Sequence, residues 1–235
     1  MSARRGPSKT VGATERRGGS MEFEVWEPYY ERILKDFGFS RAEDERAAKV
    51  LDSVLGGRRI GPRTISKEMS GKAVTVVGNA PGLGREMNRL TNVVVAADEA
   101  TSTLLAHGQI PQVIVTDLDG EVSDQVEANR RGAIVVVHAH GDNIPAIEKW
   151  AGEFVGRTMA TTQARPFPRV YNLGGFTDGD RGVFLADASA ARSIRLVGFD
   201  FERPNPKDQP PEVKKRKLDW AATLIKTLVQ RPVEF

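Results

Sequence analysis

Six aspartates follow apolar, β-branched segments, each near the point where a strand would end; they are Asp98, Asp117, Asp119, Asp142, Asp178 and Asp200. Open parallel sheets bind ligands in the crevice outside the carboxyl ends of their strands. Carboxylates gathered there repel one another unless a cation lies among them. Mg²⁺ carrying a polyphosphate is a hard cation that prefers oxygen ligands. The spacing therefore predicts an enzyme that acts on nucleotide phosphates.

The segment TDLDG holds two of these carboxylates, Asp117 and Asp119, directly after the apolar run QVIVT. Residues at i and i+2 of an extended segment point to the same side, so the pair could share a divalent cation. Asp98, at the end of the preceding strand, is the third predicted metal ligand. The alternative is an Asx-type turn that caps a helix beginning near Glu121.

The segment VTVVGNAPGLG, residues 74–84, predicts a strand, a Gly/Pro-rich turn and then a helix. Glycines let backbone N–H groups approach a phosphate, and a helix N-terminus favours an anion. The predicted phosphate-binding residues are Gly78, Asn79, Pro81 and Gly82. The motif lacks the Gly-Lys-Ser/Thr of a P-loop and the glycine spacing of the dinucleotide fingerprint. A tight turn without a ligand is the alternative.

The segment HAHGDN, residues 138–143, places His138 and His140 on the same side of an extended chain. Such a pair could ligate zinc, but no third nitrogen or sulfur ligand is evident. We therefore expect neutral imidazoles that bind the phosphate donor, with Asp142 and Asn143 in contact with the acceptor substrate. Burial of one histidine as a structural donor is the alternative.

The segment GGFTDGDRG, residues 174–182, combines close backbone approach with polar and aromatic side chains. Phe176 could stack on a flat ring, and Asp178 and Asp180 could bind a metal or the donors of that ring. Thr177 and Asp200 complete the predicted substrate contacts. Arg181 could neutralise a phosphate, which makes it a predicted catalytic residue. An Asx loop before a helix is the alternative.

The elements that would position these residues alternate between strand and helix. Two helices are expected over 22–56, the second capped by Ser40 and ended by Gly56, followed by a linker over 57–71. Strands are expected at 73–77, 93–97, 112–116, 133–137, about 169–171 and 194–198, and a final helix at about 213–230. This pattern predicts an α/β fold: a mostly parallel open sheet with helices on both faces, preceded by an N-terminal helical segment.

The expected organisation is a disordered basic tail over 1–20, the helical segment over 21–70 and a catalytic domain over 71–235. The sequence pI is about 9.2, which by itself would suggest nucleic-acid binding. Five cations and one anion lie in residues 1–20, however, whereas the whole chain carries a net charge of +3, so the remainder is about −1. The basicity is therefore a property of the tail, and we expect no nucleic-acid partner.

The composition is that of a globular protein, with 235 residues, 40% hydrophobic and 28% charged. The chain has no cysteine, which excludes disulfides, thiolate nucleophiles and cysteine-ligated zinc. No apolar run approaches the length of a membrane span, and the N-terminus lacks the apolar stretch of a signal peptide. We expect a cytoplasmic enzyme with no membrane partner; a homo-oligomer is compatible with the sequence.

Taken together, these motifs resemble the archaeal-type 6-hydroxymethyl-7,8-dihydropterin pyrophosphokinase family, which is itself similar to thiamine pyrophosphokinases. The resemblance covers roughly residues 22–230 and rests on GNAP, AADEA, PQVIVTDLDG, HAHGDN, GGFTDGDRG, LVGFDF and KKRKLDWA. One departure is Pro81-Gly82-Leu83-Gly84, which stands where the family has Pro-Ser-Leu, so a hydroxyl near the phosphates is missing.

The resemblance implies that Asp98, Asp117 and Asp119 bind Mg²⁺ and that ATP is the co-substrate. ATP would donate diphosphate to the pterin hydroxymethyl group and leave as AMP, in folate or methanopterin biosynthesis. Positioning and charge neutralisation dominate such chemistry. Three alternatives remain: a thiamine pyrophosphokinase-like enzyme, a nucleotide-sugar glycosyltransferase-like protein, and a nucleotide-sensing module without catalysis.

Overall fold

The computed structural model of the chain describes residues 21–57, 59–208 and 210–235. The predicted basic tail, residues 1–20, lies outside the described residues. Three helices come first: α1 (Phe23–Phe37), α2 (Arg41–Leu55) and α3 (Pro62–Met69). Ser40 caps α2, its hydroxyl accepting a hydrogen bond of 3.4 Å from the Glu43 amide.

A parallel sheet follows, built from short β-branched segments that alternate with helices. Its strands are β1 (Ala73–Val77), β2 (Val93–Ala97), β3 (Val113–Thr116), β4 (Ile134–Ala139), β5 (Thr158–Thr162), β6 (Val170–Tyr171), β7 (Ser193–Val197) and β8 (Val233–Glu234). The helices between and after them are α4 (Ala100–Ala106), α5 (Val122–Arg130), α6 (Ile144–Trp150), α7 (Asp178–Ala188) and α8 (Pro211–Leu228). Short 3-10 helices lie at Leu83–Arg89 (η1), Gly141–Asn143 (η2) and Ala151–Glu153 (η3).

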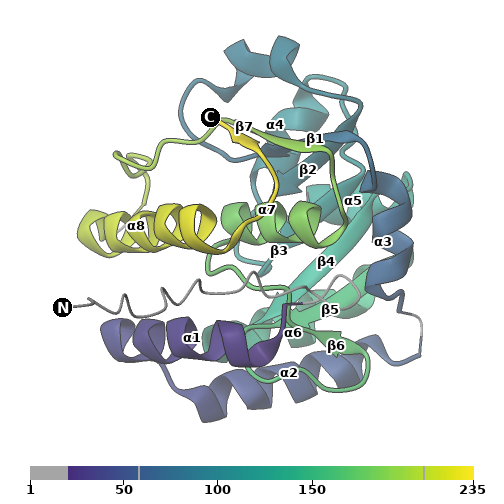
Figure 1. Cartoon of the computed structure of the whole chain (residues 1–235). Coiled ribbons are helices and arrows are strands. Elements are labelled where there is room, and N and C mark those ends of the chain that lie inside the picture. The colour runs from purple at the N-terminus through teal and green to yellow at the C-terminus, as the bar shows by residue number, and fades with distance from the viewer. Residues whose placement is uncertain (1–20, 58, 209) are drawn as a thin grey trace, which may run out of the picture.

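The strand order is β6-β5-β4-β3-β2-β1-β7-β8, and every neighbouring pair of these strands is parallel. The chain steps outward from β1 to β6 and then returns to the other side of β1 with β7 (Figure 1). Because all strands run the same way, the segments that follow β1, β2, β3 and β7 meet at one edge of the sheet.

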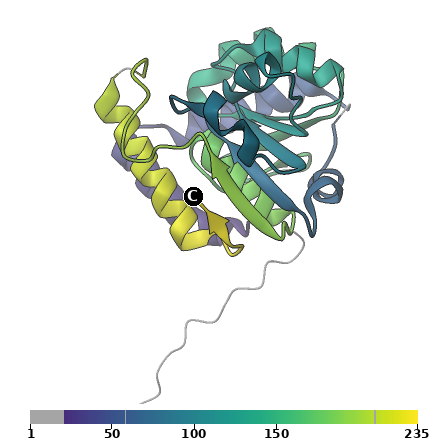
Figure 2. The same cartoon turned by 90° about the horizontal axis from the view of Figure 1, so that it is seen from above.

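Helices cover both faces of the sheet, as Figure 2 shows. One face packs against α2, α4, α5 and α6 through residues such as Leu51, Leu104 and Ile147. The other face packs against α3, α7 and α8 through residues such as Ile65 and Val183. This arrangement confirms the predicted fold class. Strands that are buried on both faces need near-continuous runs of apolar residues, and the strands of this sheet have them.

Helix α1 lies outside α7 and α8 and closes a third cluster of apolar side chains (Figure 1). Trp26, Phe184 and Leu224 are buried there. The Trp220 indole of α8 donates a 3.0 Å hydrogen bond to Asp36 of α1. The N-terminal helices thus pack directly on the elements that carry the predicted site.

Several elements differ from the expectation, among them the short strand β8, which was not predicted and pairs with β7. The stretch expected as a linker contains α3, because Pro62 favours a first helical turn and Ile65 and Met69, four residues apart, are both buried. Strand β5 was not predicted, because its sequence TMATT holds only two apolar residues; it is stabilised by pairing with β4 and β6. None of the helices in the described part of the chain has the length and apolar character needed to cross a bilayer.

Candidate active site

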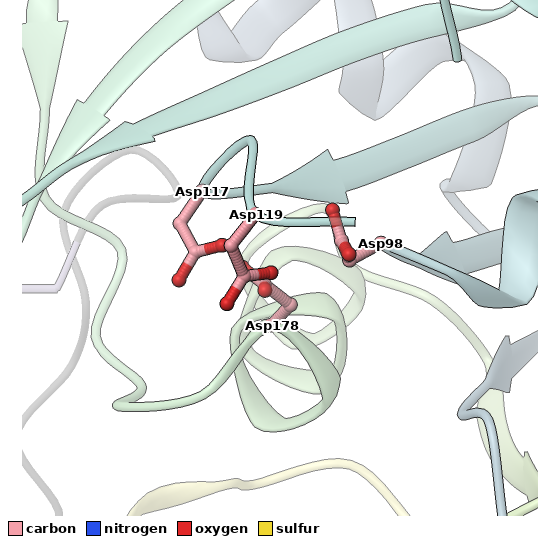
Figure 3. Close-up of side chains that lie close together, drawn as sticks. All are labelled: Asp98, Asp117, Asp119 and Asp178. Carbon is pink, nitrogen blue, oxygen red and sulfur yellow. The ribbon is translucent and has the colours of Figure 1, made fainter. Parts of the chain in front are cut away.

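Four carboxylates meet at the carboxyl edge of the sheet. Asp98 follows β2, Asp117 and Asp119 follow β3, and Asp178 opens α7. One oxygen from each lies within 4.8 Å of the others, and Figure 3 shows the four side chains gathered between the strand ends and the first turn of α7. Three of them are the metal ligands expected from the sequence, and Asp178 joins them from a motif expected to contact substrate.

The backbone between Asp117 and Asp119 is a turn rather than the extended segment that was expected. Leu118 has a φ of 70°, in the left-handed region that a leucine rarely adopts, and its side chain is buried in the core. The Leu118 amide donates a 2.9 Å hydrogen bond to the Thr116 hydroxyl, which supports this turn. The buried leucine therefore fixes where the two carboxylates lie.

Two side chains donate hydrogen bonds to Asp98, and the backbone at Gly120 passes close to it. The Thr116 hydroxyl and the Gln125 amide donate hydrogen bonds of 2.6 and 2.7 Å to its Oδ1. A Cβ added to Gly120 would lie 2.0 Å from its Oδ2. Only glycine at position 120 lets the TDLDG turn pass so close to this carboxylate.

The electrostatics of the cluster favour a cation. Burial, together with the charges of Asp117 and Asp98, raises the pKa of Asp119 to about 8. Burial also raises the pKa of Asp98, and burial with the Asp117 charge raises that of Asp178, against the opposing charge of Arg181. At neutral pH Asp119 therefore retains a proton that a bound cation would displace.

Asp117 behaves differently because of its partner. Burial acts to raise the pKa of Asp117, but the hydrogen bond and charge of His140 outweigh burial and hold that pKa below its usual value. His140 Nε2 lies 3.3 Å from Asp117 Oδ2. The Asp142 amide lies 3.4 Å from Nδ1 on the other side of the ring, so the proton on Nε2 is the one donated to Asp117.

The donor set fits a hard divalent ion. All four side chains offer oxygen, the ligand that Mg²⁺ prefers. Asp117 Oδ1 and Asp178 Oδ1 are buried and have no hydrogen-bond partner among the described residues. Buried oxygens of this kind are costly unless something satisfies them, and a cation among the carboxylates would do so.

The cluster lines a cleft of about 440 Å³ that also holds basic side chains. Besides Arg181, four cations line it, from the segment 200–208 and from α8: Arg203, Lys207, Lys214 and Lys217. Three of them pair with carboxylates on the rim, Arg203 with Asp200, Lys207 with Glu99 and Lys214 with Asp208. Lys217 makes no ion pair within the described ranges. An anionic ligand would fit beside these cations.

The remaining predicted residues divide between the cleft and its supports. Gly78, Asn79, Phe176, Thr177, Arg181 and Asp200 line the cleft. Pro81 and Gly82 do not, and the turn there leads into η1 rather than an α-helix. The ring of Phe176 packs against Phe37 at 5.1 Å between centroids, so the cleft shares this aromatic wall with α1.

Three predicted contact residues hold other parts of the protein. Asp180 caps α7 by accepting hydrogen bonds from the Phe176 and Thr177 amides. Asn143 donates to the carbonyls of Asp117 and His138. The side chain of Asp142, in contrast, supports no other group among the described residues: it is exposed on η2 and lies outside the cleft lining. His138 is buried, with Nδ1 3.2 Å from the Thr161 hydroxyl, which matches the structural alternative for one histidine.

Several cleft residues were missed by sequence reasoning. Glu99 directly follows Asp98 and binds Asn79 and Lys207, so its position beside a strand-end carboxylate was a usable signal. Phe199 and Leu218 supply apolar lining from the β7–α8 connection and α8. Both residues lie in segments that carry the family resemblance, LVGFDF and KKRKLDWA, but the sequence predicts no role for them, since they reach the cleft only through the return of the chain to β7.

Comparison with known proteins agrees with this geometry. A family model described as 6-hydroxymethylpterin diphosphokinase MptE-like matches residues 58–206. A 6-hydroxymethyl-7,8-dihydropterin pyrophosphokinase from Methanothermobacter thermautotrophicus is 42% identical over 87% of this chain and 94% of its own. Proteins of the same name from Pyrococcus furiosus and Methanocaldococcus jannaschii are 41% and 36% identical over 88% and 92% of this chain, and 94% and 99% of theirs.

Among solved structures, the MAf glycosyltransferase from Magnetospirillum magneticum AMB-1 is similar with a TM-score of 0.47 and 20% identity, over 73% of this chain and 29% of its own. That similarity is too low to support a functional argument. The family model and the three pyrophosphokinases show, by contrast, that the chain belongs to the MptE-like family of 6-hydroxymethylpterin diphosphokinases.

Proposed function

We propose that this protein is a 6-hydroxymethyl-7,8-dihydropterin pyrophosphokinase that uses ATP and Mg²⁺. The observation that carries the proposal is the cluster of four carboxylates, which lines the same cleft as several lysine and arginine side chains. This arrangement suits a reaction in which charge on several phosphate oxygens must be neutralised. The names of the curated relatives supply the acceptor.

In the proposed reaction, the pterin hydroxymethyl oxygen forms a bond to the β-phosphorus of ATP. The bond between that phosphorus and the oxygen bridging to the α-phosphate breaks, AMP leaves, and the hydroxyl proton is released. Asp98, Asp117, Asp119 and Asp178 would hold Mg²⁺, which supplies charge neutralisation at the phosphate oxygens. Their oxygens are close enough to share it.

The other residues bind and orient. Arg181 and Lys217 line the cleft and would neutralise the phosphates. Gly78 and Asn79 close the cleft beside β1 and would bind the nucleotide. Holding donor and acceptor in one geometry replaces a costly bimolecular encounter, which is the main contribution available to a protein in this chemistry.

The pterin would bind where flat apolar surface meets polar groups. Phe176 and Phe199 line the same cleft as Asp178 and Thr177. An aromatic face can stack on the pterin ring, and a carboxyl or hydroxyl group can pair with its amide-like edge. His138, His140 and Asn143 would contribute by supporting Asp117 rather than by contacting the pterin.

The assay that tests the proposal incubates the protein with ATP, Mg²⁺ and either 6-hydroxymethyl-7,8-dihydropterin, thiamine or no acceptor. We expect AMP and the pterin diphosphate in equal amounts, dependent on the pterin. ADP as the sole nucleotide product would exclude diphosphate transfer. AMP formation with thiamine alone would keep the chemistry and exclude the pterin. The product would enter folate or methanopterin synthesis, and we assign the reaction to the cytoplasm.

A further inference from the structure

A buried polar network connects the N-terminal helices to the carboxylate cluster. Asp44, in α2, is only 2% exposed although its side chain is a carboxylate. It accepts three hydrogen bonds: from the Tyr30 hydroxyl at 2.7 Å, the Gln163 side-chain amide at 2.8 Å and the Gly141 backbone amide at 2.8 Å. A carboxylate with this many donors is fixed in position.

One branch of the network leads to Asp117. Gly141 follows His140, whose Nε2 lies 3.3 Å from Asp117 Oδ2. A Cβ on Gly141 would lie 2.7 Å from the Cβ of Glu43, so α2 is in close contact with this turn. The position of the imidazole, and through it of one carboxylate in the cluster, therefore depends on where Asp44 holds the turn.

The second branch leads to Arg181. Gln163 directly follows β5 and is 4% exposed. Its amide donates to Asp44 Oδ2, while its carbonyl oxygen accepts a 3.2 Å hydrogen bond from Arg181 Nη2. The Trp26 indole of α1 holds the Gln163 backbone carbonyl at 2.8 Å.

The choice of glutamine follows from hydrogen-bonding chemistry. An ionised Asp44 can only accept, and Arg181 can only donate. A side-chain amide has one end that donates and one that accepts, so it joins a carboxylate to a guanidinium without leaving either unsatisfied. A glutamate at position 163 would face Asp44 with a second carboxylate.

We propose that Asp44 and Gln163 are positioning residues of the active site: Asp44 holds the turn that directs His140 onto Asp117, and Gln163 holds the guanidinium of Arg181. Helices α1 and α2 are then working parts of the diphosphotransferase site. This inference rests on the proposed function. Neither residue contacts the carboxylate cluster directly, so both act through another side chain.

Three substitutions separate the two branches. Asp44→Ala removes the hydrogen bonds of both branches, the one that leads to Asp117 and the one that leads to Arg181. Asp44→Asn keeps an oxygen for the Gly141 amide but presents an N–H group to the Gln163 amide, so only the Arg181 branch is broken. Gln163→Met also breaks only the Arg181 branch, with a side chain of similar length. Leu51→Val serves as the control, because it shortens a buried side chain of the same helix without touching the network.

The first measurement is binding of Mn²⁺ without substrates, followed by electron paramagnetic resonance, which needs no turnover. Residues that support metal ligands typically change metal affinity or activity by about 10- to 100-fold. We expect Asp44→Ala to weaken Mn²⁺ binding by about tenfold or more. Asp44→Asn, Gln163→Met and Leu51→Val should bind within about twofold of the unmodified protein.

The second measurement is AMP formation at saturating metal. Asp44→Asn and Gln163→Met should share a loss in kcat of about tenfold, and Leu51→Val should retain activity. The proposal is overturned if Gln163→Met matches Leu51→Val in kcat, or if a folded Asp44→Ala binds Mn²⁺ as tightly as Leu51→Val does. Should Asp44→Ala fail to fold, Asp44→Asn and Gln163→Met still test the Arg181 branch, on which the proposal can fail. An unmodified protein that makes no pterin diphosphate overturns the proposed function, while the Mn²⁺ series tests the Asp44 branch independently.

Discussion

His140 Nε2 lies 3.3 Å from Asp117 Oδ2, and this contact joins the HAHGDN turn to the TDLDG turn across two neighbouring strands. Burial raises the pKa of a carboxyl group, yet the pKa of Asp117 is lowered because this hydrogen bond and the His140 charge outweigh burial. Asp117 is thereby ionised while its neighbour Asp119 retains a proton. A cluster with one ionised and one protonated carboxyl is less repulsive than one with two charges.

His140→Leu should raise the pKa of Asp117, because it removes the largest of the effects that oppose burial and leaves only the hydrogen bond with Asp119 and the charge of Arg181. A lowered carboxyl pKa contributes stability above the unfolded value of 3.8 and loses it as the pH falls through the folded value. The free energy of unfolding of the metal-free variant should therefore fall below that of the unmodified protein at neutral pH, and the difference should begin to shrink only below the unfolded value of 3.8, as the pH falls toward the lowered folded pKa. Urea unfolding across this range measures the effect. His140→Gln retains an N–H donor, so its free energy of unfolding should lie between those of the unmodified protein and His140→Leu. Identical dependence of the unfolding free energy on pH in all three proteins would contradict the prediction.

For Asp119 we predict that the contribution to the free energy of unfolding depends on pH in the opposite direction. Its pKa is about 8 in the folded protein against 3.8 in the unfolded chain, so the folded state binds the extra proton between these values. Its contribution to stability therefore decreases as the pH rises from about 4 to about 8 in the absence of metal. Asp119→Asn should flatten this slope, as measured by thermal unfolding in metal-free buffers. A slope unchanged by the substitution would exclude Asp119 as its source.

Mg²⁺ binding should release protons at pH 7, because the cation displaces the proton that Asp119 retains. Calorimetric titration in two buffers of different ionisation enthalpy measures this release. Asp119→Asn should release fewer protons than the unmodified protein. Equal binding enthalpies in both buffers for the unmodified protein would rule out proton displacement.

Asp117→Asn and Asp119→Asn should each reduce turnover by about 100-fold or more while leaving the fold intact. Each removes a ligand charge worth several kcal/mol in the transition state, and about 1.4 kcal/mol is a factor of ten in rate. Steady-state AMP formation over a range of Mg²⁺ concentrations measures the loss, with circular dichroism as the control for folding. Near-normal rates at low Mg²⁺ would show that neither carboxylate serves the metal.

Gly120→Ala should damage the site without changing any carboxylate. The added methyl group would lie 2.0 Å from Asp98 Oδ2, so either Asp98 or the TDLDG turn must move. We expect a loss of roughly 10- to 100-fold in metal affinity, as for other residues that support metal ligands. Gly152→Ala is the matched control, because a Cβ there meets nothing within 4 Å. Equal metal affinity in both variants would show that the turn absorbs the methyl group at no cost to Asp98.

The strand-end carboxylates were predictable because the signal is local. Asp98, Asp117 and Asp119 directly follow β-branched runs, and parallel strands bring such ends together whatever the loop lengths. The turn at Leu118 was not predictable, because the extended interpretation of TDLDG ignores the buried leucine between the aspartates. Asp142 shows the limit of the same rule: it also follows a strand, but it is exposed on η2.

The supports of the site could not be found by pattern. Asp44 and Gln163 are 119 residues apart in sequence and meet only because α2 packs beside β5. Asp178 joins the metal ligands because α7 crosses β1, β2 and β3, which depends on tertiary packing rather than on the GGFTDGDRG motif. Domain boundaries at residues 20 and 70 stay predictions.

The return of the chain from β6 to β7 has a consequence for biosynthesis. The four clustered carboxylates come from residues 98–178. Of the five cations among the described residues that line the cleft, only Arg181 precedes β7, and the other four come from residues 203–217. As the ribosome releases the chain from its N-terminus, the segment that carries the proposed metal ligands is therefore made before most of the positive charge that would balance a bound polyphosphate.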